Sequence, residues 1–321
     1  MKRLGLILAG LLALAVAGFL FAQSYLGQAT IEEETAFIIP AGSSLSAVAE
    51  KLEDEGLISS ADGFLMRARL FGSSDPIQAG EFALEPGMDQ GDILAAFQSG
   101  DVIRRFVTIP EGMPSVLVYE KLMAEELLTG EIEIPLEGSV LPDTYAFERG
   151  QDRGEIIEQM QTAMDQYLAE AWAKRAPDVA VDTMRDALIL ASIVEKETGK
   201  PSERRAIAGL YSNRLRIGMK LQADPTIIYP ITKGKPLGRR IRRSEIAMEN
   251  GYNTYSKFGL PDGPITNPGR ESIAAVLNPE KHNYLFMVAD GTGGHEFNVT
   301  DAEHAAAVER WYALRRERGE M

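Results

Sequence analysis

The sequence predicts an α+β protein with an N-terminal transmembrane helix, a small strand–helix module and a larger mixed α+β domain. Three observations carry this prediction: an uninterrupted apolar run near the N-terminus, short strand patterns that lead directly into helices, and three long helical patterns followed by a loop-rich stretch. The chain of 321 residues is long enough for two domains and additional segments.

The N-terminal segment has the pattern of a membrane anchor. Lys2 and Arg3 precede an apolar run over residues 4–22, close to the roughly 20 residues that span a bilayer as a helix. Residues 15–17 could form a signal-peptidase site, but residues 19–21 continue the apolar run beyond it, which favours an uncleaved anchor. The positive-inside rule then keeps the N-terminus cytoplasmic and places the rest of the chain outside the cell inner membrane, with a single-pass topology.

A strand and helix motif occurs twice in the next part of the chain. A strand over residues 37–42 and another over 106–112 both run through I-P-x-G into a helical pattern, and a further strand is predicted at 80–84. A helix is predicted to start at Asp89 or Asp92. The strand, two helices and returning strand resemble the βααβ LysM-like module, which implies binding of peptidoglycan glycan chains; a spacer role is the alternative.

The remaining chain is predicted to be a helical domain with a long irregular insertion. Helical patterns cover about 153–175, 182–197 and 203–216, and residues 218–270 are rich in Gly, Pro, Asn and Thr. Long irregular stretches in compact domains are usually functional. A strand is predicted at 284–288 and a last helix from a Thr300 cap to about 316. The predicted boundaries are 1–22 for the anchor, 23–35 for a linker, 36–103 for the LysM-like domain, 104–150 for a connecting α/β segment and 151–321 for the last domain.

Two acidic residues lie at the end of an apolar helix. Residues 187–194 are apolar all round the helix, as in a buried helix, and Glu195 and Glu197 follow. Burial disfavours the ionised carboxyl and raises its pKa, which a general acid working near pH 7 requires; a solvated C-terminal turn is the alternative. Because about 200° separates the two side chains on a helix, they cannot both face one substrate, which argues against a two-carboxylate hydrolase built from this pair.

Four long motifs carry a family resemblance that runs from about residue 36 to 315. They are SIVEKETGKPSERR, YSNRLRIGMKLQADPTIIYP, GYNTYSKFGLPDGPITNPG and NYLFMVADGTGGHEF. The chain resembles the endolytic murein transglycosylases, the MltG or YceG-like family. The resemblance implies a lytic transglycosylase that cleaves MurNAc–GlcNAc bonds within peptidoglycan strands, leaves 1,6-anhydro-MurNAc ends and ends strand elongation.

The resemblance also implies a mechanism with a single acid. One Glu protonates the glycosidic oxygen and then acts as base on the C6 hydroxyl of the same MurNAc, which attacks its own C1 without water. The family's catalytic Glu falls on Glu195 in this sequence, with Glu197 as the second choice.

Polar and aromatic residues in the same motifs are candidates for sugar binding. Stacking rings beside amides suit a glycan groove, although Asn213 could instead brace a loop, Asp224 could be a turn or cap residue, and the YNTY segment could be a structural loop. The substrate-binding candidates are Glu197, Asn213, Gln222, Asp224, Tyr252, Asn253, Thr254 and Tyr255.

Composition excludes several classes of function. The net charge of −14 argues against nucleic acid, the absence of Cys excludes thiolate catalysis, and three His make a His-rich metal site unexpected. The glycines before His295 lack the G-x-G-x-x-G spacing of a dinucleotide-binding loop, which excludes nucleotide binding there. His295 could line the groove, but a core or loop role is expected for it. No metal or organic cofactor is implied. The resemblance implies peptidoglycan, the inner membrane and cell-wall synthases (penicillin-binding proteins) as partners.

Three rival functions stay open at this point. A hydrolytic muramidase would use Glu195 with Asp224, and a non-enzymatic scaffold would only bind peptidoglycan. A small-molecule lyase of the pterin pathway is the third, and a membrane anchor would hold such an enzyme away from cytosolic substrates.

Overall fold

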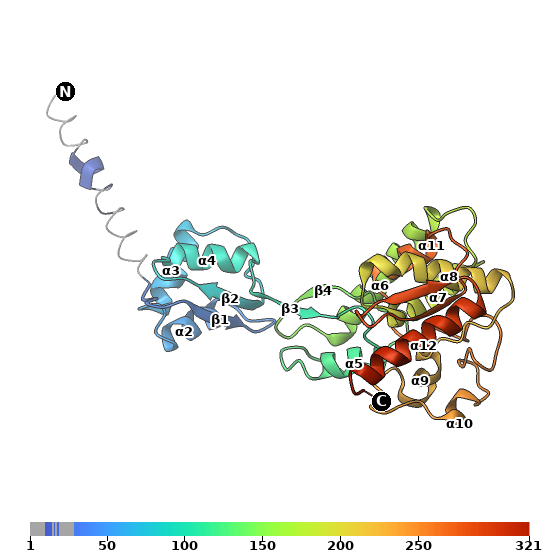
Figure 1. The fold of residues 1–321 in the computed structure, drawn as a ribbon. Coiled ribbons are helices and arrows are strands. Elements are labelled where there is room, and N and C mark those ends of the chain that lie inside the picture. The colour runs from blue at the N-terminus through green and yellow to red at the C-terminus, as the bar shows by residue number, and fades with distance from the viewer. Residues whose placement is uncertain (1–9, 15, 17, 19–28, 321) are drawn as a thin grey trace. The chain divides into compact units, whose positions relative to one another are not determined.

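The computed structural model describes residues 10–14, 16, 18 and 29–320, which form two compact units (Figure 1). Unit 1 comprises the described residues up to Arg105 together with 147–150, and unit 2 comprises 106–146 and the chain from Gln151 onward. Most of the predicted anchor and the first part of the predicted linker, residues 23–28, fall outside the described residues. Of the helices that are described, none has the length and apolar character needed to cross a membrane.

Unit 1 contains the strand–helix–helix–strand order that the sequence predicts. Its antiparallel strands pair with Phe37 opposite Phe82, and the ring of Phe97 packs on both, with centroid distances of 5.5 and 5.0 Å. Asp89 is the N-cap of the helix over Gln90–Ser99 and forms a capping box with Asp92. Both residues predicted as its start therefore lie at its N-terminal end. The elements are β1 (Thr35–Ile39), α2 (Leu45–Asp54), α3 (Ala61–Phe71), β2 (Gly80–Leu84) and α4 (Gln90–Ser99).

Two short strands connect the units. β3 (Arg104–Thr108) and β4 (Thr144–Glu148) form a two-stranded sheet, and the division between the units runs through both strands. Helix α5 (Ser115–Met123) follows β3, so the second I-P-x-G motif also leads from a strand into a helix, as predicted.

The core of unit 2 is built around a buried helix. Helix α7 (Met184–Glu197) packs against α6 (Arg153–Ala173), α8 (Arg204–Arg216) and α11 (Arg270–Leu277), and α11 also contacts α6 and α8. Because apolar residues surround α7, neighbours can cover every side of it, and its residues Ile189, Leu190, Ile193 and Val194 are buried. The prediction of a buried helix ending in two Glu residues is confirmed.

The remaining elements of unit 2 surround this core (Figure 1). The stretch 218–270 is irregular, as predicted, apart from α9 (Pro225–Thr232) and α10 (Arg243–Ile246). A 3-10 turn, η1 (Pro201–Glu203), joins α7 to α8. The hairpin of β5 (Phe286–Ala289) and β6 (His295–Asn298) packs against the last helix, α12 (Asp301–Glu317), which Thr300 caps as predicted. The strand predicted at residues 284–288 is observed at 286–289, so it begins two residues later than predicted.

Candidate active site

The two Glu residues at the end of α7 have different surroundings. The Oε2 atom of Glu195 accepts a hydrogen bond from the backbone N–H of Gly269 at 2.9 Å, and its Oε1 lies 3.8 Å from the Arg204 guanidinium. Arg204 is also paired with Glu111 at 2.8 Å. The Glu195 side chain is only 5% exposed, so it forms part of a buried ionic connection between α7, the start of α8 and the loop before α11.

Glu197 lies among polar groups of α8 and the loop that follows it. Its Oε1 accepts a hydrogen bond from the hydroxyl of Tyr211 at 2.8 Å. Although the residue as a whole is half-buried, desolvation of its carboxyl raises the pKa of Glu197 to about 7. The charge of Asp224 acts in the same direction, whereas the Tyr211 hydrogen bond and the charge of Arg214 act against it. A carboxyl with this pKa can hold and release a proton near neutral pH.

Asp224 and Tyr255 extend this polar group. The Tyr255 hydroxyl donates to Asp224 Oδ1 at 2.7 Å, and burial together with this bond raises the pKa of Tyr255. Asp224 occupies the N-cap position of α9, but its side chain makes no capping hydrogen bond. Glu197, Asp224 and Tyr255 are thus three predicted site residues that the structure brings together.

Gln222 lies two residues before Asp224 in an unusual backbone conformation. Its φ angle is +52°, in the left-handed region that residues other than Gly rarely adopt, and the residue is exposed to solvent. Its backbone N–H donates to the carbonyl of Thr254 at 3.2 Å, which links the two motifs LQADPT and YNTY.

Three other predicted substrate-binding residues hold loops in place. Asn213 Nδ2 donates to the carbonyls of His282 and Tyr284, at 2.8 and 3.2 Å. Asn253 is fully buried, and its Nδ2 donates to three backbone carbonyls of residues 245–248. Thr254, also fully buried, bonds through Oγ1 to the N–H of Ala223. Through these contacts the two amides and the hydroxyl hold neighbouring loops in place. A role of the three residues in substrate binding stays a prediction.

Tyr252 has a different environment from the rest of the YNTY segment. Its ring packs against Tyr229 with the centroids 4.8 Å apart, and the residue is half-buried. Its contact with sugar also stays a prediction.

Tyr211 and Arg214 also help to form the site, although neither was predicted from the sequence. Both are buried on α8, three positions apart and therefore on one face. Arg214 donates through Nε to the carbonyl of Leu285 at 2.7 Å and through Nη1 to that of Leu221. The sequence around Arg214 carries no signal that marks it as buried, because Ser212, Asn213 and Arg216 make this part of α8 polar.

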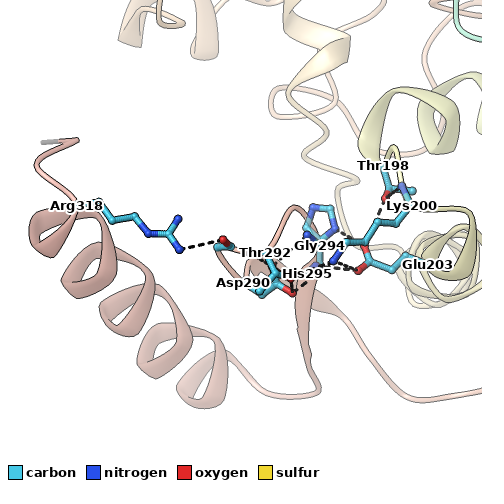
Figure 2. Close-up of polar contacts among 9 residues, drawn as sticks. Thr198, Lys200, Glu203, Asp290, Thr292, Gly294, His295 and Arg318 are labelled. Atoms are coloured by element: carbon cyan, nitrogen blue, oxygen red, sulfur yellow. Dashed lines mark hydrogen bonds and ion pairs between the residues drawn. The ribbon is translucent and has the colours of Figure 1, made fainter.

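A polar cluster supports the turn between α7 and α8 (Figure 2). Glu203 accepts hydrogen bonds from the backbone N–H of His295 at 3.1 Å and contacts its Nδ1 at 2.9 Å. Lys200 Nζ lies 3.0 Å from the hydroxyl of Thr292, and Thr198 contacts Glu203 at 3.4 Å. The cluster connects the residues directly after Glu197 to the β5–β6 hairpin, in which His295 is the first residue of β6.

An open pocket with a volume of about 490 Å³ lies beside the end of α7. A Cβ atom on Gly112, in its wall, would lie 3.4 Å from the Cγ of Glu195 and 3.8 Å from the Cδ of Lys196, so the pocket adjoins the acidic end of the helix. Its apolar side is formed mainly by Met113, Leu117, Pro225, Ile228, Tyr229 and Leu237.

Within the part of the chain that the structure describes, no group of three or more His, Asp or Glu side chains is arranged to hold a metal ion.

The chain as a whole matches a known family. The YceG-like family model matches residues 37–310, and the chain belongs to this family. The chain is 29% identical to the endolytic murein transglycosylase of Bacillus subtilis, over 94% of this chain and 91% of that protein. It is 28% identical to the endolytic murein transglycosylase of Streptococcus pneumoniae serotype 2, over 83% of this chain and 56% of that protein.

A solved structure agrees with this relationship. A crystal structure of a yceG-like protein from Listeria monocytogenes matches with a TM-score of 0.52 and 29% sequence identity, over 85% of this chain and 99% of that one. The family resemblance predicted from the four motifs is therefore confirmed.

Proposed function

We propose that this protein is an endolytic peptidoglycan lytic transglycosylase, which cleaves glycosidic bonds within glycan strands. The membership of the YceG-like family and the relatives named endolytic murein transglycosylase support this function. The single observation in the structure that supports it best is the desolvated carboxyl of Glu197, whose pKa of about 7 suits a group that must both give and take a proton.

The proposed reaction needs one acid and no water. The protonated carboxyl gives its proton to the oxygen between MurNAc and GlcNAc, and the C1–O bond breaks with the electron pair going to that oxygen. The resulting carboxylate takes the proton of the C6 hydroxyl on the same MurNAc, and the C6 oxygen bonds to C1. A 1,6-anhydro-MurNAc end and a free GlcNAc hydroxyl result, and the acid is protonated again. The attacking hydroxyl belongs to the substrate, so its proximity is built in.

We propose Glu197 as this acid, although the motif resemblance assigned the role to Glu195. The surroundings of Glu195 support a structural role, because its carboxylate is engaged by the Gly269 N–H and the Arg204 guanidinium. Glu197 instead has a single hydrogen bond from Tyr211 and a carboxylate neighbour, Asp224, that disfavours its ionisation. Asp224 would then help to hold the proton on Glu197 before substrate cleavage.

Substitution of each Glu in the full chain tests this assignment. Glu197→Gln keeps the shape of the side chain but removes the proton transfer, which is typically worth about 10²–10⁴-fold in rate. Glu195→Gln should lower stability and reduce activity less. Cleavage rates on purified glycan strands would be measured beside urea unfolding curves, and an active Glu197→Gln variant with an inactive, folded Glu195→Gln variant would return the role to Glu195.

A hydrolytic muramidase remains the second candidate, because a second carboxylate, Asp224, acts on Glu197. A hydrolase would use one carboxyl as acid and the other as nucleophile or as base for water. Mass spectrometry separates the two reactions, since an anhydro end is lighter than a reducing end by one water. Reducing ends as the sole products would establish the hydrolase.

The surroundings of the enzyme in the cell are part of the same proposal. An anchor over residues 1–22 would hold the chain in the cell inner membrane with the catalytic unit in the periplasm, in keeping with the apolar run after Lys2 and Arg3. Unit 1 would act as a LysM-like glycan-binding module, which its β–α–α–β order supports. Cell-wall synthases (penicillin-binding proteins) are the partners expected of an enzyme that ends strand elongation.

A further inference from the structure

The pocket beside the end of α7 has the chemistry of a binding site. Its apolar side is formed by α5, α9 and the loop that follows α9, through side chains that include Leu117, Ile228 and Leu237. A volume of about 490 Å³ falls within the range of about 300–1,000 Å³ found for ligand sites in proteins.

Charge in this pocket is concentrated in one residue. Three charged side chains border it: Glu111, Lys196 and Lys235. Glu111 is paired with Arg204 at 2.8 Å, and Lys235 is paired with Glu120 at 2.5 Å, so the charge of each is balanced by its partner.

Lys196 differs from these two residues. Its Nζ donates to the backbone carbonyl of Gly112 at 3.3 Å, and within residues 29–320 no carboxylate lies within 4 Å of it. An ammonium group has three donors, so Lys196 has capacity for a further acceptor. Lys196 also interacts electrostatically with Glu137, whose carboxyl accepts the N–H of Ser115 at 2.9 Å and has its pKa raised by burial. The pocket therefore suits a ligand with small apolar groups and one negative charge.

The position of Lys196 relates the pocket to the proposed reaction. Lys196 lies between Glu195 and Glu197 on α7, and Pro225 of the pocket wall directly follows Asp224. Helices α7 and α9 pack against each other, so the pocket wall and the polar group around Glu197 are built on the same pair of neighbouring helices. In peptidoglycan, each MurNAc carries on its lactyl group a short peptide with methyl side chains and a free carboxylate.

We propose that this pocket binds the peptide stem of the MurNAc residue next to the cleaved bond, with its methyl groups on the apolar side and its carboxylate on Lys196. This inference rests on the proposed function, because it assumes a peptidoglycan strand as substrate. It makes Lys196 a specificity-determining residue, which distinguishes strands that carry peptides from strands that do not.

The test compares two forms of the same substrate with the full-length protein. Uncross-linked glycan strands that carry peptide stems are compared with the same strands after an amidase has removed the stems. The measured quantity is the preference, defined as kcat/KM for the stem-bearing strands divided by kcat/KM for the bare strands. The wild type should prefer stem-bearing strands, and Lys196→Gln should lower this preference about tenfold, as expected for one lost hydrogen bond between charged groups.

Two further variants make the result specific. Lys196→Arg keeps the charge and should retain most of the preference. Lys281→Gln is the matched control, since Lys281 lies outside the pocket, is 80% exposed and pairs with Asp178 at 3.0 Å. An unchanged preference in Lys196→Gln, or equal rates of the wild type on both substrates, would overturn the inference but leave the transglycosylase function standing. If the wild type cleaved neither substrate, the proposed function would be rejected and this inference with it.

Discussion

At the scale of single residues, the carboxyl of Glu197 couples the stability of the protein to pH. Its pKa is about 7 in the folded protein and near 4.5 when unfolded. The folded state therefore keeps a proton between these values that the unfolded state has released, so this residue's contribution to stability is present below pH 4.5 and is lost as the pH rises to about 7. The slope is at most about 1.4 kcal/mol for each pH unit.

The first prediction follows from this slope. Glu197→Gln should gain stability relative to the wild type as the pH rises from 5 to 7, and the difference should then level off. Urea unfolding at several pH values measures this difference, and plots of stability against pH that run parallel for the two proteins would contradict the shifted pKa.

The same pKa bears on activity: the wild-type kcat/KM should fall above about pH 7, as the acid loses its proton.

Tyr211 gives a second prediction at this scale. Its hydroxyl bond favours the ionised form of Glu197, so Tyr211→Phe should raise the pKa of Glu197 and move the alkaline limb of the pH–rate profile upward. The buried site should also lose about 1 kcal/mol of stability. Tyr255→Phe, which removes the bond to Asp224 instead, serves as the comparison. If the alkaline limb of Tyr211→Phe stayed at the wild-type pH, the Tyr211 hydroxyl would not influence the pKa of the catalytic acid.

At the scale of secondary structure elements, the sequence was most informative where a pattern depends on neighbours along the chain. The buried character of α7 follows from apolar residues on all its sides, and the caps at Asp89 and Thr300 follow from local side-chain chemistry. The grouping of Tyr211, Asp224 and Tyr255 around Glu197 was not predictable in this way, because it depends on how α7, α8 and the loops pack. Asn253 shows the same limit. A side-chain amide can bind either a sugar or the backbone, and only the fold reveals that three backbone carbonyls accept from this one.

The close packing of α8 gives a third prediction. A Cβ atom on Gly209 would lie 2.4 Å from the backbone carbonyl oxygen of Glu280 and 2.7 Å from His282 Nε2. Ala is favoured over Gly in a helix by about 1 kcal/mol, but this clash with backbone should make Gly209→Ala destabilising by about 1–3 kcal/mol. Gly199→Ala, where a Cβ would meet no atom within 4 Å, is the control in thermal unfolding. Equal melting temperatures for the two variants would show that the segment 280–282 yields easily.

At the scale of the whole molecule, the separation into two units gives a fourth prediction. If unit 1 binds glycan, a chain without residues 36–103 should bind purified sacculi more weakly in a pull-down while still cleaving short soluble glycans. Loss of unit 1 would remove a second site of attachment to the glycan but would leave the proposed catalytic residues of unit 2 in place. Unchanged binding to sacculi would make unit 1 a spacer.

The left-handed backbone conformation of Gln222 carries a cost in stability. A glycine would adopt φ of +52° with less strain, and an exposed side chain contributes little to packing. Backbone strain of this kind is found at functional positions, and Gln222 lies two residues before Asp224 in the loop that leads to α9. The fifth prediction is that Gln222→Gly should be at least as stable as the wild type, by up to about 1 kcal/mol in urea unfolding, yet slower on glycan strands. A variant that is both more stable and equally active would mean that this strain serves no purpose in turnover.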